Sequence, residues 1–310
     1  MSIQTINARN SFQGIWPAML TPLNEALNID HAKLAAHAQS LLKAGCGGVT
    51  IFGTTGEGPS FSVRERKEAL EQLIASGFPA DRIMVSTSCA ALVETTELTQ
   101  HAVDLGVHGC LVLPPFFFKG VSDEGIFNGY VQVIEGVNRS QWRLYLYHIP
   151  QVIGVSLSHD VIQKLINRYP KLIVGIKDSA CDQAHSVSLA KAFMPPLTVY
   201  VGFEPDLTTM GPLGSTGAIS GLANFMPRVV HRMVLSSQDP HTANDAKRVD
   251  EMLALLKPHS LMPALKGVMA ALSHDVSWLR VRSPLVAMTP AAYTDFAKQV
   301  DAFNIDSLHE

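Results

Sequence analysis

The chain has 310 residues, of which 47% are hydrophobic and 16% are charged, so a large buried core is expected and wholesale disorder is excluded. Lys and Arg total 24 and Asp and Glu total 27, which gives a formal net charge of −3 without any basic tract. This charge pattern argues against nucleic acid or an anionic membrane as the main partner. The 12 histidines are dispersed, and neither a P-loop nor an H-E-x-x-H motif occurs, so we expect no bound metal and no bound nucleotide.

Cysteine usage and apolar runs bear on localisation. The four cysteines, Cys46, Cys89, Cys110 and Cys181, are scattered without a C-x-x-C pair, which is typical of reduced thiols in a cytoplasmic protein. Residues 1–14 lack the apolar core of a signal peptide. No apolar run reaches the roughly 18 residues that a membrane span needs. We therefore expect a cytoplasmic protein with no membrane segment.

Short β-rich apolar runs alternate with helical patterns along the chain. The predicted strands are Ile15–Leu20, Gly48–Phe52, Arg82–Thr87, Gly109–Leu113, Arg143–Tyr147, Leu172–Lys177, Leu197–Gly202 and Gly217–Ser220. The predicted helices between them include Asp30–Ala44, Glu94–Asp104, His159–Arg168 and Ala184–Ala192. Another helix is expected to begin after Ser62, because Ser62 and Glu65 form a capping-box pattern.

Eight strands, each followed by a helix, predict parallel pairing and a closed (β/α)8 barrel of the TIM type. A doubly wound open sheet is the alternative, but the first strand–helix turn, residues 21–29, is not a glycine-rich nucleotide loop. Beyond about residue 225 only helical patterns remain, at Arg228–Ser236, Ala243–Leu256, Met262–Leu272 and Ala291–Phe303. We therefore expect a barrel with the active site over residues 1–235 and a C-terminal helical region over 236–310.

The strand that ends at Lys177 carries the most specific signal for chemistry. Barrel enzymes build their sites at the carboxyl ends of the strands, and the run before Lys177 is apolar enough to be buried. Alternation places Gly175 and Lys177 on one face, so Gly175 is expected to leave room beneath the lysine. A lysine there loses hydration, and a nucleophilic amine becomes available. Taken by itself, however, Lys177 favours the simpler interpretation of a strand-end lysine with its ammonium in solvent.

Polar groups follow other strand ends. Tyr147 lies on the strand preceding that of Lys177, and its phenol can pass a proton, although a packed core tyrosine is the commoner case. Thr54 and Thr55 lie on a glycine-flanked turn whose hydroxyls and amides can hold a carboxylate. That turn is also explained by backbone shape alone.

Four segments taken together resemble the dihydrodipicolinate synthase / N-acetylneuraminate lyase family of pyruvate-dependent class I aldolases. They are Gly53-Thr54-Thr55-Gly56-Glu57, then Tyr147-x-x-Pro150, then Gly175-Ile176-Lys177, and finally Gly217-Ala218-Ile219-Ser220 with Asn224. Their order and spacing match, and the resemblance covers essentially the whole chain. It implies a homotetramer that needs neither a metal nor an organic cofactor.

The resemblance also implies a role for individual residues. Lys177 is similar to the Schiff-base lysine, and Tyr147 to the tyrosine that shuttles protons. Thr54 resembles a member of the proton relay, and Thr55 the residue that binds the keto-acid carboxylate. Gly202 and the carbonyl of Ile219 correspond to backbone elements of the pyruvate pocket.

Departures from the family pattern bear on the second substrate. Phe117 stands about where dihydrodipicolinate synthases carry a relay tyrosine, and Val152 replaces their carboxylate-binding arginine. Gly202-Phe203-Glu204 resembles sialic-acid lyases, but Gly221-Leu222 replaces their Ser-Thr pair. Ser179 and Glu204 are expected to bind a small hydroxylated chain.

These features predict a Schiff-base lyase, either an aldolase or a dehydratase, for a 2-keto-3-deoxy sugar acid or a similar short hydroxy-keto acid, with pyruvate as product or co-substrate. Dihydrodipicolinate synthase is the runner-up. A non-catalytic keto-acid sensor on the same barrel is a further alternative, against which the presence of both Lys177 and Tyr147 argues. A phosphosugar isomerase is the last, since residues 214–217 would suit either a phosphate site or a turn into the final strand.

Overall fold

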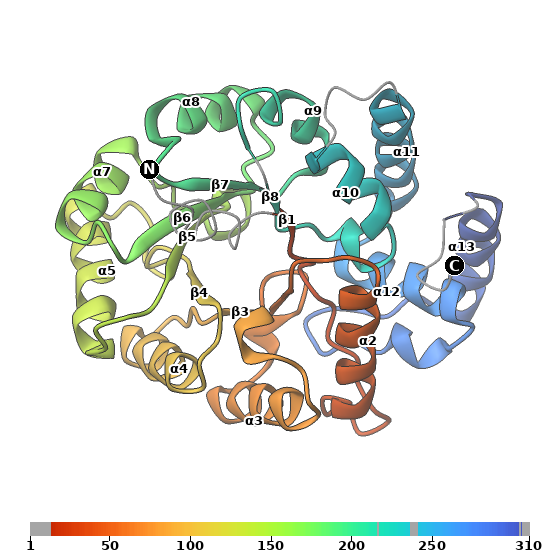
Figure 1. The fold of residues 1–310 in the computed structure, drawn as a ribbon. Helices are drawn as coiled ribbons and strands as arrows, with labels where there is room; N and C mark the ends of the chain where they lie inside the picture. Colours follow the sequence, from red (N-terminus) through yellow and green to blue (C-terminus); the bar gives the residue numbers. More distant parts are fainter. Residues whose placement is uncertain (1–13, 216, 236–240, 304, 306–310) are drawn as a thin grey trace.

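The computed structural model describes residues 14–215, 217–235, 241–303 and 305. Eight strands occupy the centre of the molecule and helices surround them (Figure 1). All strand pairs are parallel, in the order β1-β8-β7-β6-β5-β4-β3-β2. The strands are β1 (Gly14–Ile15), β2 (Val49–Ile51), β3 (Ile83–Ser86), β4 (Gly109–Val112), β5 (Leu144–His148), β6 (Ile173–Asp178), β7 (Thr198–Val201) and β8 (Gly217–Ala218).

The helices alternate with the strands as the sequence predicts. Those that follow the first seven strands are α2 (His31–Lys43), α3 (Val63–Ala75), α4 (Leu92–Asp104), α5 (Asp123–Val137), α6 (Pro150–Ile153), α7 (His159–Arg168), α8 (Gln183–Phe193) and α9 (Leu207–Met210). Four more follow β8, namely α10 (Pro227–Leu235), α11 (His241–Leu256), α12 (Leu261–Ser273) and α13 (Pro290–Phe303). The capping box before α3 is confirmed, since Ser62 and Glu65 each bond the other's backbone amide.

The segment after β1 closes the barrel. Trp16 N–H donates to Ala218 O of β8 at 2.8 Å, whereas Met19 N–H donates to Thr50 O of β2 at 2.8 Å. The predicted strand Ile15–Leu20 is therefore too long, because only its first residue lies in β1 and the rest bridges two strands irregularly. Pro17 explains the interruption, since it accepts from Thr50 N–H but has no N–H of its own to continue the ladder. The fold is the expected (β/α)8 barrel.

The C-terminal helices pack on one side of the barrel, where the blue helices α11, α12 and α13 lie outside the ring of Figure 1. Helix α12 is mostly buried, packing against α13 and against the short 3₁₀ helix at Val276–Leu279. The predicted division after residue 235 stays a prediction, and residues 236–240 lie outside the described part, as does most of the segment 1–14. Among the described residues, no helix has the length and apolar character to cross a membrane.

Candidate active site

Tyr147 and Lys177 are neighbours at the carboxyl ends of β5 and β6. The strand register pairs the two residues directly, and Lys177 Nζ donates to the Tyr147 hydroxyl at 3.2 Å. The side chains are almost completely buried, with exposed fractions of 5% for Lys177 and 1% for Tyr147. The strand-end lysine therefore has its ammonium in the barrel mouth rather than in solvent, within reach of a group that can exchange protons with it.

Thr54 extends this pair toward the loop after β2. Its Oγ1 lies 3.4 Å from the Tyr147 hydroxyl, so Lys177 of β6, Tyr147 of β5 and Thr54 of the loop after β2 form a chain of polar groups. Thr55 points elsewhere, toward the turn after β8: its Oγ1 lies 3.6 Å from where a side-chain carbon would stand on Gly221. The structure thus joins Thr54 to the lysine–tyrosine pair and places Thr55 beside β8.

A buried ion pair, which sequence reasoning missed, holds the same loop. Glu57 has a left-handed backbone with φ of 55° and pairs with Lys266 of α12, both side chains being fully buried. Lys266 also donates to Arg280 O at 2.7 Å. Burial lowers the pKa of Lys266 below its usual value, although Glu57 opposes the shift. The available signal was a single charge within the apolar stretch LMPALKGVMAALS.

The space beneath Lys177 is filled, so the prediction that Gly175 leaves free room there is wrong. A side-chain carbon on Gly175 would stand 2.8 Å from Tyr145 Cδ1 and 2.8 Å from Thr198 O. The Tyr145 ring occupies the place because β5 and β6 set Tyr145 opposite Gly175, and its hydroxyl lies 2.9 Å from His108 Nε2. Gly175 is thus needed for close packing of a neighbouring aromatic ring.

Gly202 and Ser179 lie against the lysine. Gly202 N–H donates to Asp178 O at 2.7 Å, and a side-chain carbon on Gly202 would stand 2.9 Å from Lys177 Cε. Ser179 Oγ is buried, and the described residues offer it no hydrogen-bond partner. Ile219 is also fully buried, and its N–H donates to Val201 O at 3.0 Å. The Ser179 hydroxyl and the backbone at Gly202 therefore border the lysine, whereas Ile219 bonds the end of β7.

Glu204 serves the turn after β8. Its Oε1 accepts from the Ser220 hydroxyl at 2.6 Å and from Leu222 N–H at 3.1 Å. Half of the carboxylate is thus occupied by the protein itself, and a role for Glu204 in binding substrate stays a prediction.

On the far face of β5 and β6 lies a cluster of His148, Asp178 and His185. Asp178 Oδ2 accepts from Ser186 Oγ at 2.7 Å and lies 3.1 Å from His185 Nδ1, while His148 Nδ1 accepts from Leu157 N–H at 3.1 Å. Burial lowers the pKa of His148 to about 4, and the bond to Asp178 raises that of His185. The three groups are close enough for a metal ion, but protein donors already occupy His148 Nδ1 and Asp178 Oδ2. We assign the cluster to fixing α8 against the strands that carry Tyr147 and Lys177.

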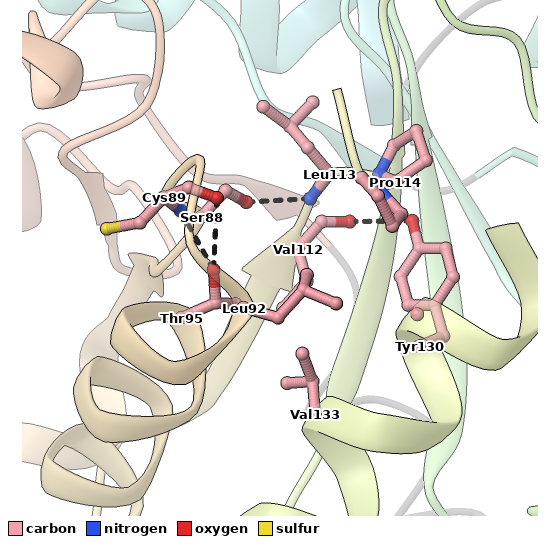
Figure 2. A pocket seen from close by; sticks show the side chains of 11 residues that line it. Ser88, Cys89, Leu92, Thr95, Val112, Leu113, Pro114, Tyr130 and Val133 are labelled. Carbon is pink, nitrogen blue, oxygen red and sulfur yellow. Dashed lines mark hydrogen bonds between the residues drawn. The ribbon is translucent and has the colours of Figure 1, made fainter. Parts of the chain in front are cut away.

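The loops after β3 and β4 form another wall of the barrel mouth. Figure 2 shows Ser88 Oγ accepting from Leu113 N–H at 2.8 Å and the Tyr130 hydroxyl donating to Val112 O at 3.1 Å. The gap between α4 and α5 at this point measures only about 10 Å³, about the room of one water molecule. Leu113 and the loop that follows it are therefore firmly anchored.

Comparisons with known proteins identify the family of the chain. Residues 11–303 match the model of the Dihydrodipicolinate synthetase family. An uncharacterized DapA-like lyase of Chloroflexus aurantiacus is 34% identical, over 89% of this chain and 92% of the relative. N-acetylneuraminate lyase of Rattus norvegicus is 27% identical, over 73% and 71%. The crystal structure of dihydrodipicolinate synthase from Agrobacterium tumefaciens superposes with a TM-score of 0.88 at 32% identity, covering 94% of this chain and 99% of that one. The chain belongs to the dihydrodipicolinate synthetase family and is an enzyme of its Schiff-base-forming, class I aldolase type.

Proposed function

We propose that this enzyme cleaves, or in reverse forms, the C3–C4 bond of a short 4-hydroxy-2-keto acid, such as a 2-keto-3-deoxy sugar acid, through a Schiff base on Lys177. The observation that carries the proposal is the buried contact of 3.2 Å between Lys177 Nζ and the Tyr147 hydroxyl. It brings a nucleophile and a proton carrier together at the carboxyl end of a barrel, where such enzymes build their sites.

The reaction begins when the amine of Lys177 attacks the C2 ketone and water leaves. The iminium draws electrons from the C3–C4 bond as a base removes the proton of the C4 hydroxyl. An aldehyde departs, the resulting enamine takes a proton at C3, and water releases pyruvate. Lysine thereby supplies the electron sink that other enzymes obtain from a cofactor.

In this proposal the protein's other groups handle protons and position the substrate. Tyr147 takes the C4 hydroxyl proton, and Thr54, 3.4 Å away, relays it. Thr55 and the free hydroxyl of Ser179 hold the keto-acid carboxylate beside Gly202 and Ile219. The buried, unpartnered oxygen of Ser179 supports its part, because an uncompensated hydroxyl is costly until a ligand bonds it.

The alternative functions require different residues at the mouth of the barrel. Dihydrodipicolinate synthesis calls for a charge to hold the aldehyde's carboxylate, and Val152 supplies none. A sensor would bind a keto acid without turnover. For a phosphosugar isomerase, Ser215 would have to face a phosphate, but its hydroxyl donates to Val199 O at 2.8 Å, and Thr216 lies outside the described residues.

The first experiment is to incubate the enzyme with pyruvate, reduce it with borohydride and map the adduct by peptide mass spectrometry. We expect an adduct on Lys177 that is absent from Lys177→Ala. Tyr147→Phe should still form the adduct but lose about 10² to 10⁴ in kcat, the usual contribution of a proton-transfer group. A folded enzyme without an adduct would contradict the proposal. Turnover is then assayed with a 4-hydroxy-2-keto acid: an adduct on Lys177 without turnover would favour the sensor, and loss of water without release of an aldehyde would favour the dehydratase.

We propose in addition a cytoplasmic homotetramer. Phe117 and Phe118 support subunit contacts, because their side chains are 66% and 75% exposed in the single chain and form one apolar patch. The four cysteines are free, which suits a reducing compartment. Sedimentation analysis of the wild type and of Phe117→Ser tests the assembly.

A further inference from the structure

A cavity of about 340 Å³ opens directly beside Tyr147 and Thr54. It lies where a substituent on C4 of the substrate would extend, because these two residues carry the relay proposed for the C4 hydroxyl. Its volume is within the range of small-molecule sites. The residues around it therefore bear on which aldehyde the enzyme releases or accepts.

The walls of this cavity are mostly apolar. They come from separate parts of the chain: the loop after β2, the loop after β4, helix α6, helix α12 and the segment after the last 3₁₀ helix. The apolar residues are Phe52, Pro59, Leu113, Phe116, Val152, Ile153, Met262, Pro284 and Leu285. Val152 lies at the mouth, with 58% of its side chain exposed.

Several polar residues that border the cavity are already engaged within the protein. Glu57 is fully buried and pairs with Lys266 through Oε1, its carboxylate having no other partner among the described residues, and Ser88 Oγ accepts from Leu113 N–H at 2.8 Å. Lys119 Nζ donates to two backbone carbonyls, those of Phe116 and Ile153, and so caps the end of α6. Besides Thr54 and Tyr147 of the proposed relay, Ser60 and Ser86 provide the remaining hydroxyl groups on the cavity wall.

A polyhydroxylated chain bound in this cavity would lose hydrogen bonds to water and face mostly apolar walls. Each hydroxyl left without a hydrogen-bond partner costs roughly 1–3 kcal/mol of binding free energy. We infer that the C4 substituent is an uncharged apolar group, so that the partner of pyruvate is a small aliphatic or aromatic aldehyde. This inference rests on the proposed cleavage and condensation through a Schiff base on Lys177. Among the short 4-hydroxy-2-keto acids it selects those with an apolar C4 substituent in place of the 2-keto-3-deoxy sugar acids. In the condensation, C3 of pyruvate loses a proton and bonds the aldehyde carbon, while the aldehyde oxygen gains a proton.

The test measures kcat/KM for condensation of pyruvate with isobutyraldehyde, benzaldehyde, D-glyceraldehyde and succinic semialdehyde. Pyruvate consumption is the readout, and the borohydride adduct is recorded in every sample. We expect kcat/KM for isobutyraldehyde or benzaldehyde to exceed that for glyceraldehyde by at least about tenfold, the scale of discrimination in an apolar pocket.

Two variants of one position sharpen the comparison. Val152→Arg places a charge at the mouth and should lower kcat/KM for the apolar aldehydes by about tenfold while raising it for succinic semialdehyde. Val152→Thr is its matched control, since it adds a hydroxyl at nearly constant volume, and it should change these values less.

The inference is overturned if glyceraldehyde is the better substrate, or if the adduct forms but neither apolar aldehyde condenses. It is also overturned if the wild type prefers succinic semialdehyde and Lys119→Met removes that preference, because Lys119 would then bind the carboxylate. Absence of the Lys177 adduct itself is a separate result, which refutes the proposed function.

Discussion

Gly202 approaches Lys177, the proposed Schiff-base lysine, so closely that a side chain at this position would require a neighbour to shift. An added side-chain carbon would stand 1.9 Å from Ser179 Oγ, 2.9 Å from Asp178 O and 2.9 Å from Lys177 Cε. The Ser179 hydroxyl can rotate away from such a carbon. The Asp178 carbonyl belongs to the backbone of β6 and cannot, so the backbone at Gly202 and the Lys177 side chain would have to shift. The absence of a side chain at this position therefore helps to set the position of the Lys177 side chain.

We expect Gly202→Ala to lower the rate of pyruvate adduct formation by about 10²-fold, the effect of displacing a reacting group by about 1 Å. The rate is measured by adding borohydride to samples taken at successive times after pyruvate and quantifying the adduct on Lys177 by mass spectrometry. Gly125→Ala is the control, because its added carbon meets nothing closer than Ser122 Oγ at 3.7 Å, and its rate should equal that of the wild type. Equal rates for Gly202→Ala and wild type would show that the lysine does not depend on this gap.

At the scale of secondary-structure elements, helix α12 and the loop after β2 depend on each other. Glu57 and Lys266 are both fully buried, and Thr54 and Thr55 lie three and two residues before Glu57. The ion pair therefore ties the C-terminal helices to the loop that carries part of the proposed relay. A helix appended to the barrel acts in this way as a support for the site.

Removing either Glu57 or Lys266 alone should strongly destabilise the fold, because the charge of the remaining residue stays buried without its partner. We expect Lys266→Met to lower the free energy of unfolding by roughly 3–5 kcal/mol, and the double change with Glu57→Gln to recover part of it. Urea unfolding measures both. Lys247→Met is the control, since the Lys247–Glu251 pair is exposed and should contribute less than about 1 kcal/mol. An equally small effect at Lys266 would mean that the pair is not buried in solution.

For the molecule as a whole, buried histidines link stability to pH. Burial lowers the pKa of His37, His108 and His148 to about 4 each. The unfolded chain takes up these protons near pH 6.5, whereas the folded protein resists them down to about pH 4. The unfolded state thus binds more protons in this window, so stability falls as the pH falls through it. His185 opposes the trend, because its pKa is raised by its bond to Asp178.

We expect the urea midpoint to decrease from pH 7 to pH 4.5, since each of these histidines costs on the order of 1.4 kcal/mol per unit of pKa shift. His37 Nε2 lies 2.9 Å from Asn224 Oδ1. His37→Gln keeps an N–H donor for that oxygen and removes one of the three titrating groups, so the slope should flatten by about a third. A midpoint that stays constant over this range would contradict the assignment of neutral, buried rings.

Local signals in the sequence were sufficient for the architecture and for the lysine–tyrosine pair. Alternating strands and helices fix parallel pairing, and consecutive parallel strands then bring Tyr147 and Lys177 together at one end of the barrel. The capping box at Ser62 and the boundaries of α7 were likewise readable, because they depend on residues a few positions apart.

Only the tertiary structure decided the rest. The Tyr145 ring fills the space at Gly175, Lys266 pairs with Glu57, and segments far apart in the sequence line the apolar cavity. Each of these depends on the register between strands or on where the C-terminal helices pack. Sequence periodicity tells which face of an element is buried but not which distant residue it meets. The sequence by itself therefore determined the barrel and the class of chemistry, whereas packing determined the shape and polarity of the space offered to the second substrate.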